Sequence, residues 1–152
     1  MTIKLIYHAH GGDIELHSAG ITEDDGWFTT VFIMLFSNRR ANADDELPDA
    51  NMDAQGWPGD SYFDHPIGSR LWLLSREKVL PGVLHRAKDY ALEALAPLIE
   101  MKMAKSIEVE ARTWYQPGSR EPWLRLDARI TKADGAVLPY GFSLRWEGHY
   151  GV

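Results

Sequence analysis

Two stretches of the chain carry apolar residues at helical spacing. Between residues 28 and 36 they recur at i, i+3, i+4, i+7 and i+8, which predicts a helix with one face on the core. A second stripe follows Pro81, a residue tolerated at a first helical position. We expect Pro97 to kink or restart that helix, because proline lacks the backbone donor and clashes with the preceding turn. The stripes consist of Phe28, Val31, Phe32, Leu35 and Phe36, and of Leu84, Ala87, Ala91, Leu95 and Leu98.

From Ser106 onwards the apolar period changes to two, which is the period of strands with one buried face. Three such runs are visible, and Ala133-Asp134-Gly135 is a hairpin turn signal between the second and the third. The pattern predicts a three-stranded antiparallel sheet. The alternating apolar positions are Ile107, Val109 and Ala111; Leu124, Leu126, Ala128 and Ile130; and Leu138, Tyr140, Phe142, Leu144 and Trp146.

The N-terminal region reads as short strands. Residues 3–7 are β-prone, Gly11-Gly12-Asp13 is a turn signal, and Ile14 and Leu16 alternate with polar residues. Acidic residues 23–25 suit the positive end of the dipole of the helix that follows. A short helix is expected over residues 68–75. The prediction is a single α+β domain spanning residues 1–152, with N-terminal short strands, two to three helices and a C-terminal three-stranded sheet packed on the helices.

Residues 41–65 form a long, acidic stretch rich in proline and glycine. Loops of this length are uncommon in compact domains and are often functional. Trp57 and the pair Tyr62-Phe63 lie within it, so this segment is not a free linker. We expect its rings to pack either on this subunit or on a partner.

Composition narrows the class of protein. The chain is 45% apolar and 25% charged, which is ordinary for a globular domain, and it contains no cysteine. Disulfides, thiolate metal sites and cysteine nucleophiles are therefore excluded. The net charge of −6, without a basic stripe, argues against nucleic acid as the main partner. No apolar run reaches the roughly 20 residues of a membrane helix, and residues 1–8 lack the apolar core of a secretion signal.

Candidate chemistry is sparse. His8 and His10 point the same way on a strand, but no further ligand at motif spacing completes a metal site, so a solvated strand face is favoured. Adjacent acids such as Asp44-Asp45 and Asp24-Asp25 are more typical of solvated loops than of a catalytic carboxyl pair. Hydrolase, phosphate-binding and dinucleotide-binding motifs are absent. A dispersed Ser-His-Asp triad stays open, without positive support. We therefore expect no catalytic residue, no metal and no cofactor.

Tryptophan and arginine are the candidates for partner contacts, because both are enriched at interface hot spots. The chain has six tryptophans, and Trp123 falls on the strand face opposite Leu124 and Leu126. This position predicts either an exposed interface residue or a tryptophan that covers the edge of the sheet, and both interpretations stay open. Arg39, Arg40 and Arg70 flank the acidic loop. They are expected to bind that loop or a partner, and local pairing worth about 0–1 kcal/mol is the competing interpretation.

Several blocks in a fixed order resemble a known family. A helix ending in Leu35-Phe36-Ser37-Asn38-Arg39-Arg40 is followed by Gly56-Trp57-Pro58-Gly59-Asp60 and by Ile67-Gly68-Ser69-Arg70-Leu71-Trp72-Leu73-Leu74. Next come a helix and the C-terminal strands. Together these blocks resemble the phage Mu tail protein family typified by the product of gene forty-six, and the resemblance covers nearly the whole chain. That family is distantly similar to the wedge protein encoded by gene twenty-five of T-even phages, also called lysozyme-like or sheath initiator.

The resemblance implies a structural subunit of a contractile tail baseplate, without enzymatic activity. Its implied partners are other wedge and hub proteins and the first sheath ring, in several symmetry-related copies, and its implied place is the virion tail after assembly in the host cytoplasm. The Glu-Pro-Arg tripeptide of the T-even-type family is absent from the helix–sheet junction. The partner-binding residues are expected to be Arg39, Arg40, Trp57, Arg70, Trp72, Trp123, Tyr140, Phe142, Leu144 and Trp146.

An exposed sheet edge is a template for strand addition. We therefore expect the strand at residues 137–146, or its neighbour, to pair with another chain. The alternatives are a tail-associated cell-wall hydrolase and a stand-alone binding module.

Overall fold

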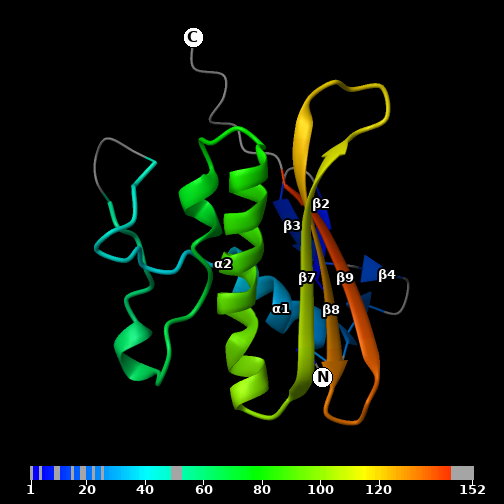
Figure 1. Cartoon of the computed structure of the whole chain (residues 1–152). Coiled ribbons are helices and arrows are strands. Elements are labelled where there is room, and N and C mark those ends of the chain that lie inside the picture. The colour runs from blue at the N-terminus through cyan, green and yellow to red at the C-terminus, as the bar shows by residue number, and fades with distance from the viewer. Residues whose placement is uncertain are drawn as a thin grey trace.

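The computed structural model describes residues 26–48 and 53–144, together with the backbone of six short strands within residues 2–24. Two α-helices precede a three-stranded antiparallel sheet, which confirms the predicted α+β class (Figure 1). The sheet packs on helix α2, which spans Pro81–Glu100. Helix α1, Trp27–Phe36, lies behind α2 in the same view.

Helix α1 matches the predicted stripe, with Val31 and Leu35 completely buried. It starts after Gly26, whose φ of 84° is a left-handed conformation that glycine adopts without strain. The acidic residues before it do not lie in its first turn, because Glu23 and Asp24 form strand β6. The expected dipole contact is therefore wrong, since these two acids belong to a strand and the helix starts only after the Gly26 cap.

Helix α2 starts at Pro81 as predicted, but it runs without interruption through Pro97 to Glu100. The expected kink or restart is wrong. Pro97 lies in the last turn, so only one intrahelical donor is lost, and its ring is buried in the core. The last turn closes through the Met101 amide, which donates to the Pro97 carbonyl at 2.9 Å.

In the described residues between the two helices, the helical structure is limited to two short 3₁₀ turns. The expected helix over residues 68–75 is a shorter 3₁₀ helix, η2, at Leu71–Leu74. A further 3₁₀ turn, η1, spans Asp60–Tyr62 within the long acidic loop.

The sheet contains β7 (Ala104–Tyr115), β8 (Pro122–Lys132) and β9 (Val137–Leu144), in the order β7-β8-β9. The register pairs Ala111 with Leu126 and Leu126 with Phe142, so the predicted apolar positions share one face. The predicted turn closes through the Gly135 amide, which donates to the Lys132 carbonyl at 3.0 Å.

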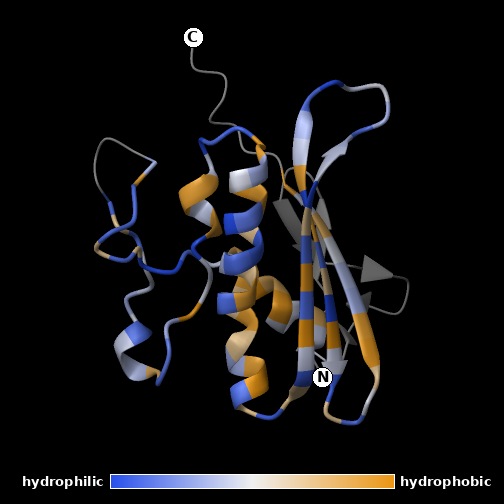
Figure 2. Cartoon of the chain, in the orientation of Figure 1, coloured by the Kyte–Doolittle hydropathy of each residue, from blue (hydrophilic) through white to orange (hydrophobic). Residues whose placement is uncertain are grey.

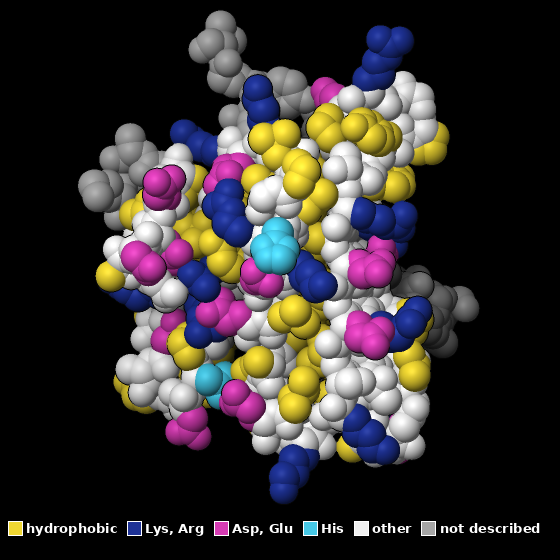
Figure 3. Space-filling view, in the orientation of Figure 1, with side chains coloured by type: hydrophobic (Ala, Val, Ile, Leu, Met, Phe, Trp, Pro, Cys, Tyr) yellow, Lys and Arg dark blue, Asp and Glu magenta, His cyan; other side chains and the backbone are white. Residues whose placement is uncertain are grey.

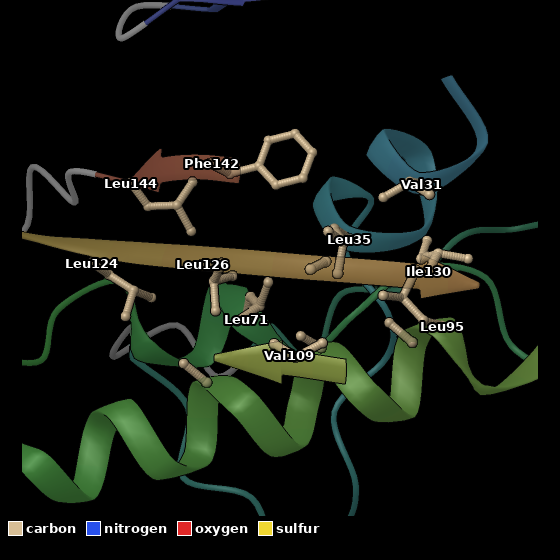
Figure 4. Close-up of a cluster of buried hydrophobic side chains, with 14 of the residues drawn as sticks. Val31, Leu35, Leu71, Leu95, Val109, Leu124, Leu126, Ile130, Phe142 and Leu144 are labelled. Atoms are coloured by element: carbon tan, nitrogen blue, oxygen red, sulfur yellow. The ribbon is translucent and has the colours of Figure 1, made fainter. Parts of the chain in front are cut away.

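The core lies between the inner face of the sheet and the two helices. Figure 2 shows apolar residues along these elements, and Figure 4 shows the buried side chains that meet there. Phe28 and Phe36 of α1 both pack against Phe142, with ring centroids 6.1 and 5.1 Å apart. The largest completely buried side chains are Leu35, Leu74, Leu95, Leu98, Leu124, Leu126 and Ile130.

The N-terminal short strands are confirmed as three antiparallel pairs, β1–β6, β2–β3 and β4–β5. The predicted turn at Gly11-Gly12-Asp13 is wrong, because these residues lie in β3 and His8 of β2 pairs with Gly11. The chain therefore reverses before Gly11. The remaining bounds are β1 Thr2–Ile3, β2 Leu5–His8, β3 Gly11–Ile14, β4 Leu16–His17, β5 Gly20–Ile21 and β6 Glu23–Asp24. Among the helices described, none is long and apolar enough to cross a bilayer.

Candidate interaction surfaces

Arg70 is the centre of a charged network that joins the acidic loop to α2. Its Nε and Nη2 donate to the two carboxylate oxygens of Glu93 at 2.9 and 3.2 Å, and its Nη1 donates to both oxygens of Asp45 at 2.9 and 3.0 Å. The guanidinium also lies 4.6 Å from the centre of the Tyr90 ring. Arg39 approaches the same Glu93 carboxylate at 3.9 Å. Arg70 therefore binds the loop, as one of the two sequence interpretations proposed.

The Arg70 network is only slightly open to solvent. The side chains of Arg70 and Asp45 are 16% and 11% exposed. Burial lowers the pKa of Arg70, but its hydrogen bonds to Glu93 and Asp45 outweigh this and hold the pKa above its ordinary value. The guanidinium is therefore charged at every pH at which the protein is folded, and it is committed to contacts within the chain.

A second seam fastens the segment around Arg70 to the end of α1. The Ser69 amide donates to the Ser37 carbonyl at 2.9 Å, and the Arg39 amide donates to the Ser69 carbonyl at 3.0 Å. Trp72 is half-buried and donates its indole N–H to the Arg39 carbonyl at 2.8 Å. Gly68 has a φ of 96°, and a Cβ at that position would overlap the Ser37 carbonyl. This seam therefore requires glycine.

The aromatic turn, which we define as residues 57–63, projects from the loop. Trp57 and Phe63 contact each other, with ring centroids 5.5 Å apart, and both are half exposed, whereas Tyr62 is 87% exposed. These rings do not find full cover on this subunit. Arg40 is also exposed, and its side chain lies against Gly56 at the base of the turn.

The interpretation of Trp123 as an exposed residue is wrong. Its side chain is 6% exposed and packs edge-on against Trp114, with ring centroids 5.9 Å apart. The two residues are partners in the β7–β8 register. Alternation identified the strand face correctly, but it could not show that the facing tryptophan covers this end of the sheet. Trp123 is therefore part of the packing of this subunit.

On β9 the structure directs the predicted side chains inwards. Phe142 and Leu144 are buried and Tyr140 is half-buried. Their side chains belong to the core, so they are not available to a partner, whereas Val137 and Pro139 of the same strand are exposed. Trp146 lies outside the described residues.

The open edge of β7 is a feature that the sequence reasoning missed. Within the described part of the chain, no backbone hydrogen bond joins β7 to any element other than β8. Figure 3 shows a pale strip of backbone between the side chains of α2 and a column of acidic and basic side chains. A hollow of about 830 Å³ is lined by Lys88 and Leu92 of α2 and by residues of all three strands, among them Glu108 of β7, Asp127 of β8 and Gly141 of β9. The sequence signal that could have identified this edge is a run of twelve strand residues without proline or glycine.

The outer face of the sheet is a network of ion pairs. Asp127 accepts from Arg125 at 2.9 Å and from Arg112 at 3.1 Å, and Arg129 lies 3.8 Å from Glu108. Gly141 of β9 leaves the space that the Arg125 guanidinium occupies. These charges neutralise one another across the strands.

No group of three potential histidine or carboxylate ligands lies together among the described residues. Of the acidic pairs, Asp45 is bound by Arg70, whereas Asp44 is solvent-exposed. The side chains of Asp24 and Asp25, and those of His8 and His10, fall outside the described residues.

Comparison with known proteins identifies the family of this chain. Residues 27–137, from the start of α1 to the start of β9, match the family described as phage protein GP46. The chain belongs to this family. It is 44% identical to "Baseplate protein gp46" of Escherichia phage Mu over 146 residues, which are 96% of this chain and 97% of that protein. It is also 32% identical to "Mu-like prophage FluMu protein gp46" of Haemophilus influenzae over 145 residues, 95% and 96% of the two chains.

Proposed function

We propose that this chain is a non-enzymatic structural subunit of a contractile tail baseplate, in a phage or a prophage. The observation that carries the proposal is the 44% identity to the Mu baseplate protein across nearly the full length of both chains. The alignment covers 96% of this chain and 97% of the Mu protein, so neither protein has a sizeable domain that the other lacks. The same scaffold therefore supports the same type of role.

The described structure supports a role in assembly. Its innermost charged groups, Arg70, Asp45 and Glu93, are engaged with one another, so they hold the loop against α2. The two surfaces that offer contacts are the aromatic turn and the open edge of β7. Figure 1 places the loop and the sheet on opposite sides of α2. A subunit with contact surfaces on opposite sides can connect two neighbours.

The finer proposal is that the subunit joins wedge proteins around the hub and accepts or donates a strand at the first sheath ring. Several symmetry-related copies would assemble in the host cytoplasm. Strand addition needs unpaired backbone groups along a sheet edge. β7 and β9 are the outer strands of this sheet, but β9 contains Pro139, which has no amide donor and is typical of protected edges. The twelve-residue β7 has no such interruption, and we therefore favour it over β9 as the accepting edge.

Co-purification tests the baseplate role. The full chain, tagged and expressed with the neighbouring genes of its tail cluster, is expected to co-purify with other tail proteins in a fixed ratio. A chain that stays monomeric in their presence would instead be a stand-alone module. Release of soluble fragments from purified peptidoglycan, abolished by a point substitution that leaves the fold intact, would establish the hydrolase alternative and refute the non-enzymatic role.

A truncation after Leu144 tests the contribution of the C-terminal residues to strand exchange. The expected result is a monomer that folds, because all residues of β9 remain, but that fails to assemble, because the segment after Leu144 would contribute to the strand that pairs with another chain. Tails formed at normal yield by this truncated chain would show that residues 145–152 are dispensable for strand exchange. The β7 edge would then be the remaining candidate.

A further inference from the structure

We propose that the aromatic turn is a docking surface for a positively charged, arginine-bearing segment of another protein. Tyr62 is 87% exposed, and Trp57 and Phe63 are each 49% exposed, all within seven residues of one another. Large aromatic side chains dominate the energetics of protein interfaces, and exposed apolar patches mark interaction sites. These three side chains belong neither to the Arg70 network nor to the hydrophobic core, so no role within the subunit accounts for their exposure.

The rings are presented by a turn with its own internal framework. Asp60 accepts from the Ile67 amide at 3.1 Å and from the Trp57 amide at 3.4 Å, and the Tyr62 amide donates to the Gly59 carbonyl at 3.0 Å. The Trp57 ring lies over Gly59, where a Cβ would overlap it. The backbone of the turn and the Trp57 ring are thus held in place before any partner arrives, which reduces the entropy lost on binding.

The turn is also fastened to the rest of the domain. The Ala41 amide donates to the Ala54 carbonyl at 2.9 Å, and the Asn38 side chain donates to that of Gln55. A force applied to the aromatic turn would therefore reach α1 and, through the Arg70 network, α2. Such a connection is what a docking surface in a load-bearing assembly requires.

Charge identifies the type of occupant. Residues 41–66 contain seven acidic residues and no lysine or arginine. Asp45 and Asp60 are used within the subunit, whereas Asp44, Glu46, Asp53 and Asp64 are exposed. Figure 3 shows acidic side chains gathered on this side of the molecule. The surrounding potential therefore favours a cationic partner and opposes nucleic acid or an anionic lipid surface.

Arginine suits both features of the surface. A guanidinium stacks on aromatic rings and forms charge-assisted hydrogen bonds with carboxylates. The same combination already occurs inside this chain, where Arg70 lies over Tyr90 and binds Asp45 and Glu93. A second copy of the chain is a weaker candidate, because each copy carries a net charge of −6.

Site-specific photo-cross-linking tests the proposal. A photoreactive phenylalanine replaces Tyr62 in the full chain, or Tyr115 as a control, which is 55% exposed and ends β7. Both are expressed in cells that produce all the tail proteins, and cross-links are mapped in whole cells and in purified tails. The expected result is a cross-link from position 62 to a lysine- or arginine-containing peptide of a different protein, and no cross-link to that same peptide from position 115. A cross-link to a copy of this chain, to lipid or to an uncharged peptide would overturn it, as would no cross-link.

The two proposals fail separately in this experiment. Absence of the chain from purified tails refutes the baseplate role, while a cross-link in cells to a cationic segment still supports the docking surface. Conversely, tails that contain the chain but give no cross-link at position 62 refute the docking surface alone.

Affinity measurements then test the chemistry with the cross-linked segment as a synthetic peptide. Tyr62→Ala is expected to weaken binding about 30-fold, the effect typical of a hot-spot aromatic. Asp64→Lys is expected to weaken it about 10-fold, with a reduced salt dependence. Tyr115→Ala should leave the affinity unchanged. Equal affinities for the Tyr62→Ala and Tyr115→Ala proteins would overturn the aromatic contribution, and an Asp64→Lys protein that binds normally would overturn the charge argument.

Discussion

Replacement of Arg70 by alanine should destabilise the protein far more than loss of a surface arginine. The substitution removes four hydrogen bonds to two carboxylates and the contact with the Tyr90 ring. It leaves Asp45, only 11% exposed, without its cation. Removal of one partner from a fully buried ion pair costs about 3–5 kcal/mol. Glu93 is 32% exposed and can regain water, so we expect a smaller loss, about 2–3 kcal/mol.

Arg86 provides the matched control. It pairs with Glu77, but the two side chains are 44% and 40% exposed. Exposed pairs of this kind contribute about 0–1 kcal/mol, so Arg86→Ala should lower the free energy of unfolding by less than about 1 kcal/mol. Urea denaturation followed by tryptophan fluorescence would measure both variants, with equal m-values required for the comparison.

Two further substitutions sharpen the test. Arg70→Lys retains the charge but cannot reach both carboxylates in a planar fork, so its stability should fall between that of the wild type and Arg70→Ala. In the double variant Asp45→Asn, Arg70→Ala, the stranded carboxylate is gone and part of the loss should be recovered. The reasoning is refuted if Arg70→Ala costs no more than Arg86→Ala.

Other expectations concern backbone geometry, packing and pH. Gly68→Ala should destabilise the protein by about 1–3 kcal/mol, because alanine is strained at φ 96° and its Cβ meets the Ser37 carbonyl. Gly82→Ala, in the open first turn of α2, should be neutral or stabilise the protein by up to about 1 kcal/mol. Thermal melts should therefore show a lower melting temperature for the first variant and an unchanged or higher one for the second. Trp123→Ala should cost about 3–5 kcal/mol in urea denaturation, as expected for a buried aromatic, and a loss under 1 kcal/mol would contradict its burial. The hydrogen bond from the Ala136 amide holds the pKa of Asp134 below its ordinary value of 3.8. The ionised carboxylate therefore stabilises the hairpin fully above pH 3.8, and this stabilisation is lost as the pH falls from 3.8 through the lower pKa of the folded state. NMR titration should give a pKa for Asp134 below 3.8.

The periodic patterns were sufficient to predict most of the fold. Both helices and all three strands of the sheet were recovered, because each is long and buries one continuous face. Local signals were less reliable. The tripeptide at Gly11 suggested a turn, and Pro97 suggested a helix break, but strand pairing and core packing outweighed these local preferences.

The candidate surfaces were recovered only in part. The acidic loop and its aromatic residues are evident from the sequence alone. The burial of Trp123 was left undecided, because strand alternation specifies a face and not what covers it. The roles of Tyr62 and Phe63 were also incompletely recognised, since exposure depends on how the turn is folded.

The chain's sequence by itself determined the α+β class, the order of its elements and its family, because these depend on periodicity and on residue order. Only the tertiary structure decided which charges are internal and which surfaces are available. Asp45, Arg70 and Glu93 are 25 and 23 residues apart along the chain, and no periodic signal links them. Helix packing brings them together, and the same packing leaves the aromatic turn and the β7 edge exposed. Internal groups can be distinguished from available ones only by their three-dimensional contacts, because the same residue types occur in both sets.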